Sequence, residues 1–133
     1  MGGTLAARTK TVTAQKLVIV DAEVKPVVTI GMAESGKGRG IVIFDSNGNK
    51  RAELGLTADA DTGSTLVLKG EDGKTRIHLI DQKIGPRIQL IDQDYRQPFV
   101  EMGLSNPKGI PFIEINDKTG KQMFGWGGNA YKN

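Results

Sequence analysis

One stretch of this sequence has residue types and spacing that are typical of phosphate binding. Residues 31–37, GMAESGK, directly follow an apolar run at 27–30, as a phosphate-binding loop follows a strand. Such a loop needs a hydroxyl side chain after the lysine to hold magnesium, and a helix that begins there. Here Gly38 takes the place of the hydroxyl residue, and another apolar run starts at Ile41. We therefore predict no nucleotide site. Lys37 and Arg39 stay as candidates for a loose anion contact, against a plain loop.

His78 is the only histidine, and it lies in the alternating run TRIHLID at 75–81. A catalytic histidine needs a nucleophile or a carboxylate within reach, and a single histidine cannot form a histidine-rich metal site. Its place on the polar side of an alternating strand predicts an exposed histidine or one that is paired across strands.

Two pairs of aspartates have the oxygen atoms that calcium prefers, Asp59 with Asp61 and Asp92 with Asp94. A calcium loop needs six or more oxygen ligands and usually a bidentate glutamate downstream, which neither stretch shows. Aspartates that stabilise turns explain both pairs. We predict no catalytic, cofactor-binding or metal-ligating residue, no cofactor, and a protein that is not an enzyme.

Composition narrows the classes of partner. The chain has 133 residues with 25% charged and 38% hydrophobic residues, which is typical of one globular domain. A net charge of +3 without a basic stripe argues against nucleic acid, and the absence of cysteine excludes disulfides and thiol catalysis. Apolar runs stay far below the ~20 residues of a membrane span, and residues 1–16 contain no signal-like apolar segment. Synthesis in the cytoplasm is expected; a final place in a virion or an extracellular appendage stays open.

The residues 41–56, IVIFDSNGNKRAELGL, predict the unit from which the chain is built. An apolar strand leads into Asn47-Gly48, which predicts a type I′ turn, and a more polar strand follows. Four similar hairpins are predicted around it, with their strands at 17–21 and 27–32, 65–70 and 75–81, 87–92 and 99–104, and 112–117 and 122–126. Equivalent residues recur about 24 positions apart, for example Gly48 and Gly73. We predict an N-terminal arm at 1–15, which is flexible or extended with strand from Lys10 to Gln15, one domain of five hairpins at 16–126 and a tail at 127–133.

The two strands of each hairpin differ in pattern. First strands such as residues 17–20 and 41–44 are apolar at every position, whereas second strands such as 51–56 alternate. A strand without a polar face must be covered on both sides, so the first strands are predicted to be interior and the second strands to lie at a surface. One thin chain cannot provide that cover. The fold class that we predict is all-β: tandem hairpins of ~24 residues stacked as an elongated β-solenoid or fibre, in an intertwined homotrimer.

A resemblance supports this interpretation. The apolar strand followed by Asp-x-x-Gly-x-x-Arg-x-x-Leu-Gly, as in residues 44–55, resembles tandem repeats of uncharacterised bacterial and phage-associated proteins. It is also similar, more loosely, to the strand–turn–strand repeats of trimeric viral and phage fibre shafts. The resemblance covers residues 16–126, although Val24 and Tyr95 stand where the turn glycine belongs. It implies a structural shaft or attachment module without catalytic residues.

The predicted function is therefore assembly with copies of itself. We expect a non-enzymatic shaft, spacer or attachment segment of a phage or cell-surface appendage, with head-to-tail growth into filaments as a further expectation. The alternative is a binding module that displays its second strands and loops to a glycan or protein receptor.

Overall fold

A computed structural model of the chain describes residues 12–32, 39–56, 63–81, 85–92, 99–105 and 109–127. These residues form ten strands and no helix, which confirms the all-β prediction. The strands are β1 (Lys16–Val20), β2 (Pro26–Met32), β3 (Arg39–Phe44), β4 (Lys50–Leu56), β5 (Ser64–Lys69), β6 (Thr75–Ile80), β7 (Arg87–Leu90), β8 (Val100–Ser105), β9 (Ile110–Asn116) and β10 (Gln122–Gly127).

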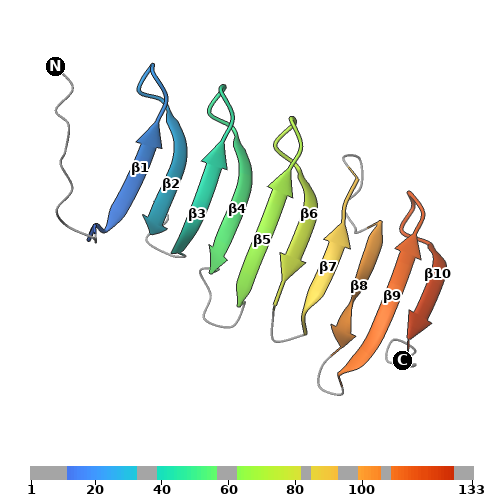
Figure 1. Ribbon diagram of the computed structural model, residues 1–133. Helices are drawn as coiled ribbons and strands as arrows, with labels where there is room; N and C mark the ends of the chain where they lie inside the picture. Colours follow the sequence, from blue (N-terminus) through green and yellow to red (C-terminus); the bar gives the residue numbers. More distant parts are fainter. Residues whose placement is uncertain are drawn as a thin grey trace, which may run out of the picture.

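The ten strands form one open sheet in which every strand pairs with its neighbours in the chain. The order is β1 to β10 without a crossover, and all the pairings are antiparallel. Figure 1 shows the turns that follow β1, β3, β5 and β9 along one long edge of the sheet. The hairpins begin at Lys16, Arg39, Ser64, Arg87 and Ile110, that is 23, 25, 23 and 23 residues apart. The predicted strands are therefore present at the predicted spacing.

The turns are of a different type from the one predicted. In the β3–β4 turn the Gly48 amide donates to the Asp45 carbonyl at 3.0 Å, and the Asp45 amide donates to the Asn49 carbonyl at 2.9 Å. Gly48 has a φ of 81°, whereas Asn47 is not among the residues with a positive φ. This is a type I turn followed by one left-handed residue, so the type I′ prediction was wrong. The reason is the length of the loop: the bond between Asp45 and Asn49 encloses three residues, 46–48, whereas a type I′ hairpin turn has two. Beyond the turn the register shifts once more, because Phe44 pairs with Lys50 and Ile43 with Ala52.

The same turn recurs in three other hairpins, and one of them is strained. The left-handed position is Gly73 in the β5–β6 turn and Gly120 in the β9–β10 turn, but Val24 in the β1–β2 turn. Val24 has a φ of 65°, a conformation that is costly for a β-branched side chain. Val24 is one of the two residues that stand in the sequence where the turn glycine belongs. Tyr95, the other such position, lies outside the described residues.

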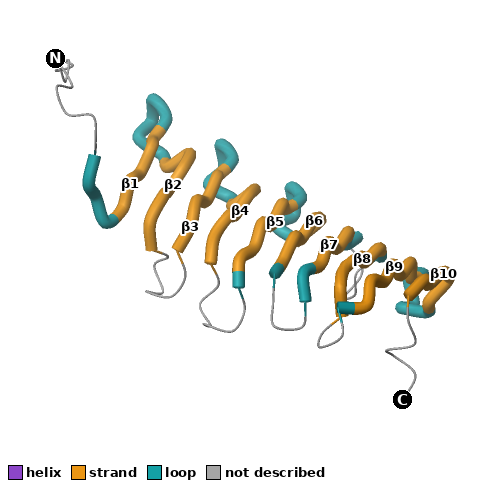
Figure 2. Tube along the Cα trace, turned by 60° about the horizontal axis from the view of Figure 1, so that its bottom comes forward, coloured by secondary structure: helices purple, strands orange, loops and turns teal. Residues whose placement is uncertain are grey.

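The sheet is a single layer (Figure 2), and the described residues enclose almost no core. Phe112, at 6% exposure, is the one buried hydrophobic residue among them. First strands are not interior: all five residues of β1 are exposed, and Ile43 in β3 is 46% exposed. The predicted contrast between interior first strands and surface second strands is therefore wrong within one chain, because burial alternates by face and not by strand. Residues 12–15, predicted as possible strand, precede β1 without forming one.

Candidate functional site

The register of the sheet brings apolar side chains together in two uninterrupted rows on one face. Partner residues follow one another across all nine pairings, and positions two apart along a strand lie on the same face. The first row is Leu17, Ile30, Ile41, Leu54, Leu66, Leu79, Ile88, Met102, Ile113 and Trp126. The second row is Ile19, Val28, Ile43, Ala52, Leu68, Ile77, Leu90, Val100, Ile115 and Phe124. We call these twenty positions, none of them polar, the apolar face.

Nothing within the described residues covers the apolar face. Leu54 is 52% exposed in the middle of the first row, and Trp126 is 61% exposed at its end. The side chains form a shallow trough of about 630 Å³ between β4 and β10, lined by Leu54, Leu79, Ile88, Met102 and Trp126 among others. A second hollow of about 520 Å³ continues it over β2, β3 and β4. The trough therefore follows the length of the sheet and does not form an enclosed ligand pocket.

The size of this face is that of a protein–protein interface. Ten strands at ~4.8 Å spacing extend for about 43 Å, and strands of about five residues are ~17 Å long, so the face covers roughly 700 Å². A standard stable interface buries about 800 Å² on each partner, and soluble monomers rarely expose contiguous apolar patches above a few hundred Å². The apolar face thus has the area of a specific interface.

The opposite face of the sheet carries polar side chains that interact with one another. Lys69 Nζ lies 2.6 Å from Glu53 Oε1, across the β4–β5 pairing. Arg87 Nη1 donates to Glu101 Oε1 at 2.7 Å, and the Arg87 guanidinium stacks over the Phe112 ring at 5.4 Å. Because these charges lie mostly on neighbouring strands, each is stabilised within one chain. This face needs no partner.

A row of glycines lies at the connection-side end of the same opposite face. Gly31, Gly40 and Gly55 are paired in sequence across β2, β3 and β4, and Gly103 pairs with Phe112 further along. A Cβ atom on Gly55 would overlap the Arg39 carbonyl oxygen, and one on Gly40 would overlap the Leu54 carbonyl oxygen. The backbones of adjacent strands approach one another too closely here for any side chain. The repeated Gly between two apolar residues in the sequence is therefore a requirement of backbone approach.

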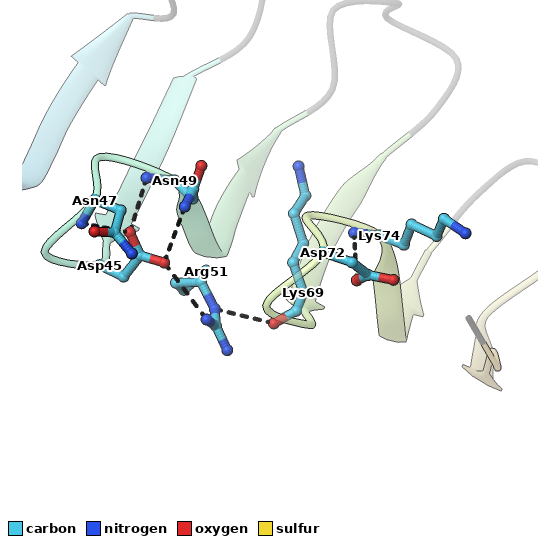
Figure 3. Close-up of polar contacts among 7 residues, drawn as sticks. All are labelled: Asp45, Asn47, Asn49, Arg51, Lys69, Asp72 and Lys74. Carbon is cyan, nitrogen blue, oxygen red and sulfur yellow. Dashed lines mark hydrogen bonds and ion pairs between the residues drawn. The ribbon is translucent and has the colours of Figure 1, made fainter.

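The hairpin turns are stabilised by aspartates that accept backbone hydrogen bonds. Asp45 Oδ1 accepts from the amides of Asn47 and Asn49, both at 2.9 Å, and Arg51 joins this turn to the next hairpin by donating to the Lys69 carbonyl (Figure 3). The pKa of Asp45 is lowered, mainly by the hydrogen bond from the Asn49 amide.

Two other turn aspartates are also easier to ionise than usual. The pKa of Asp117 is lowered, above all by the hydrogen bond from the Thr119 side chain, at 2.7 Å, together with the Thr119 amide. In the β5–β6 turn the first residue is Gly70 and the aspartate stands two places later, at Asp72. Desolvation acts most strongly on Asp72 and opposes ionisation, but the Lys74 amide and the Arg76 guanidinium outweigh it and lower its pKa (Figure 3 shows the Lys74 contact). These aspartates are turn-stabilising groups, as predicted for this residue type.

The residues singled out in the sequence do not converge on a site. Arg39 lies exposed at the start of β3, paired with Met32 and Leu56, while Lys37 lies outside the described residues. His78 Nε2 lies 2.8 Å from Thr65 Oγ1 on the neighbouring strand, which confirms the prediction of a cross-strand partner.

The predicted acidic pairs are described only in part, and no metal site emerges among the described residues. Asp92 follows β7, whereas Asp59, Asp61 and Asp94 lie outside the described ranges. Among the described residues, no three His, Cys, Asp or Glu side chains are grouped so that they could hold a metal ion. The part of the chain that the structure describes also has no helix of the length and apolarity needed to cross a membrane.

Sequence reasoning missed the ion pairs of the opposite face and the two continuous apolar rows. Both depend on which residue of one hairpin lies opposite which residue of the next. The available signal was the strict alternation in residues 87–90, where Ile88 and Leu90 point to one face and Arg87 and Gln89 to the other.

Comparisons with known proteins add no relative. No family model matches the sequence, and no curated protein matches it significantly. The resemblance to bacterial and phage repeat proteins therefore stays a prediction.

Proposed function

We propose that this chain is a non-enzymatic structural module that assembles with copies of itself into a homotrimeric β-fibre. It serves as a shaft, spacer or attachment segment of a phage or cell-surface appendage. Three sheets turn their apolar faces toward a common axis, and their opposite faces form the outer surface. The observation that carries the proposal is the uncovered apolar face, twenty positions without a polar residue.

The free energy of association comes from removing this face from water. At about 25 cal/mol for each Å² of apolar surface, burial of roughly 700 Å² gives on the order of 15 kcal/mol per chain before the entropy of association is subtracted. The twenty positions of the apolar face are Ile, Leu, Val, Met, Ala and aromatic residues, so the gain in free energy comes from these side chains. A copy of the same chain is a suitable cover because its face has the same length and the same strand spacing.

Strand length favours three copies. A six-residue strand is about 20 Å long, and the centre of an equilateral triangle with that side lies about 6 Å from each side. Half of the usual face-to-face sheet spacing is about 5 Å, so three sheets arranged as a triangular prism fill their shared interior with side chains. The strands then run across the fibre axis, and the sheet extends along the axis from β1 to β10.

The mass of the purified protein in solution tests the proposal. Size-exclusion chromatography with light scattering is expected to give about 43 kDa, three times the 14.3 kDa of one chain, or whole multiples of 43 kDa. A mass of about 29 kDa, twice 14.3 kDa, would replace the prism by a two-sheet sandwich. A stable monomer would overturn self-assembly and leave the alternative, a module that displays its second strands and loops to a glycan or protein receptor.

A further inference from the structure

Within the part of the chain that the structure describes, the two ends of the sheet are open edges. β1 and β10 each pair with a single neighbour, and every described residue of both strands is exposed. Natural edge strands are usually protected by proline, by charged side chains or by a bulge that breaks the pairing. Here β1 (KLVIV) has one charge, at Lys16, and β10 (QMFGWG) has none, with the bulge confined to its first residues. Both edges are therefore suited to pairing with another strand.

The direction of the strands allows the two edges to pair with each other. Because the sheet contains an even number of antiparallel strands, β10 runs opposite to β1, as the arrows in Figure 1 show. Placing β1 of a second copy beside β10 of the first continues the antiparallel alternation without a break. Pairing β1 with β1 would turn the second sheet round and leave β10 as the free edge at both ends.

We propose that copies of this chain join end to end, with β10 of one copy pairing antiparallel with β1 of the next in a single register. Trp126 lies opposite Leu17 of the next copy, and Phe124 lies opposite Ile19 of the next copy. Both rows of the apolar face then run from one copy into the next without a gap. Gly125 and Val18 of the next copy meet on the opposite face.

The side chains select this register over its neighbours. A slip of one residue moves the whole apolar set of one strand to the other face. A slip of two residues places Trp126 opposite Gln15 in one direction, and Phe124 opposite Asp21 in the other. Among the registers that keep both apolar faces on the same side, only the proposed one pairs both aromatic residues with aliphatic ones.

This inference rests on the proposed function, because a continued sheet has a continued apolar face that sister copies must cover. The chain has no cysteine, so engineered cysteines report the contact without background. We would purify and assemble Val18→Cys and Gly125→Cys separately, mix them under mild oxidation, and separate the products by non-reducing denaturing electrophoresis. In the control, Val20→Cys replaces Val18→Cys on the same face, two residues along β1.

The expected result is a cross-linked pair of chains from V18C with G125C, and at least about fivefold less from V20C with G125C, because a disulfide needs Cα atoms within ~7 Å. Equal yields from both mixtures, or no cross-link in either, would overturn the proposal. Efficient cross-linking of V18C alone would overturn it in favour of β1–β1 pairing. The mass of each variant before mixing separates the two ideas: a trimer without cross-links contradicts only the end-to-end contact, whereas a monomer contradicts the proposed function.

Discussion

The two faces of this sheet are made by the same strands in the same register, yet they behave as opposites. On the opposite face, Glu53 meets Lys69 and Glu101 meets Arg87, so the charges are stabilised within one chain. On the apolar face every side chain would be stabilised by removal from water, and one layer of strands cannot bury it. The comparison teaches that one face is stabilised by contacts within the single sheet, whereas the other leaves apolar side chains exposed, which is why we propose self-association.

The largest expected effect comes from placing a charge on the apolar face, and the same charge on the opposite face of the same strand is its control. Leu66 and Val67 are neighbours in β5 and point to different faces. Leu66→Lys puts an unpaired ammonium group into the shared interior, which costs about 3–5 kcal/mol per chain, and is expected to dissociate the assembly. Val67→Lys places the same group beside Glu53 and should leave the mass unchanged. Light scattering compares the two, and an intact assembly for Leu66→Lys would contradict the role of the apolar face.

The close approach of backbones on the opposite face predicts the next largest effect. In Gly55→Ala the new Cβ would overlap the Arg39 carbonyl oxygen, so β3 and β4 must separate. We expect a loss of more than about 2 kcal/mol in the free energy of unfolding, measured by urea denaturation. Thr65→Ala is the matched control, because Thr65 pairs with Gly55 in the same row but carries a side chain. Equal losses in the free energy of unfolding for both variants would show that the approach of the two backbones does not require glycine at position 55.

Ion pairs of the opposite face should differ in strength according to their burial. The Arg87 and Glu101 side chains are 16% and 12% exposed, whereas Lys50 and Glu53 lie 4.0 Å apart and are more open to water. Double-mutant cycles with Arg87→Met and Glu101→Gln are expected to give a coupling energy of about 1–2 kcal/mol. The cycle with Lys50→Met and Glu53→Gln should give about 0.5 kcal/mol or less. A reversed order would contradict the account of this face.

A smaller effect is expected at the strained turn. Val24→Gly relieves a left-handed conformation at a residue that is 74% exposed, so we expect a gain of about 1 kcal/mol in the free energy of unfolding. The reciprocal change, Gly48→Val, introduces the same conformation into the β3–β4 turn and should lose a similar amount. Thermal unfolding of the two variants measures both, and a loss for Val24→Gly would show that other contacts hold this turn.

The weakest effect is a dependence of stability on pH that comes from the turns. Asp45, Asp72 and Asp117 have pKa values below the ordinary 3.8, so the folded chain holds these protons less tightly than the unfolded chain. Their contribution is complete above the ordinary pKa and is lost as pH falls through the lowered values, that is between about pH 5 and pH 2. The triple variant D45N/D72N/D117N keeps acceptor oxygens but does not titrate. Its urea midpoint should fall less over this range than that of the natural chain, and an equal fall would assign the pH dependence elsewhere.

Much of the fold could be predicted because its information is local. Alternation, Gly48 and the 24-residue spacing are readable along the chain, and they place the hairpins close to their observed bounds. The turn type was not readable, because it depends on which residues close the loop, here the amide of Asp45 and the carbonyl of Asn49. The pattern of residues 41–44 was also misleading: Val42 is apolar but lies on the opposite face beside Thr29 and Glu53, where no partner is needed.

For the candidate site, the sequence predicted that apolar strands lack cover, but not which residues form the apolar face. The first strands, apolar at every position, indicated that one chain lacks cover, and among the described residues β1 and Ile43 are exposed as that premise requires. The continuous rows could not be predicted, because nothing in the sequence fixes the register of one hairpin against the next, such as that of β4 with β5. The partner of each charge, Lys69 for Glu53 for example, depends on the same register.

The most direct test of the central claim is to measure how the two faces react with solvent in the assembled protein. Hydroxyl-radical labelling read by mass spectrometry compares Leu79 and Met102 on the apolar face with Val67 and His78 on the opposite face. We expect Leu79 and Met102 to be protected in the natural protein and to become reactive in the dissociated Leu66→Lys variant, with Val67 and His78 unchanged. Equal reactivity of Leu79 and Met102 in both proteins would show that sister copies do not cover this face.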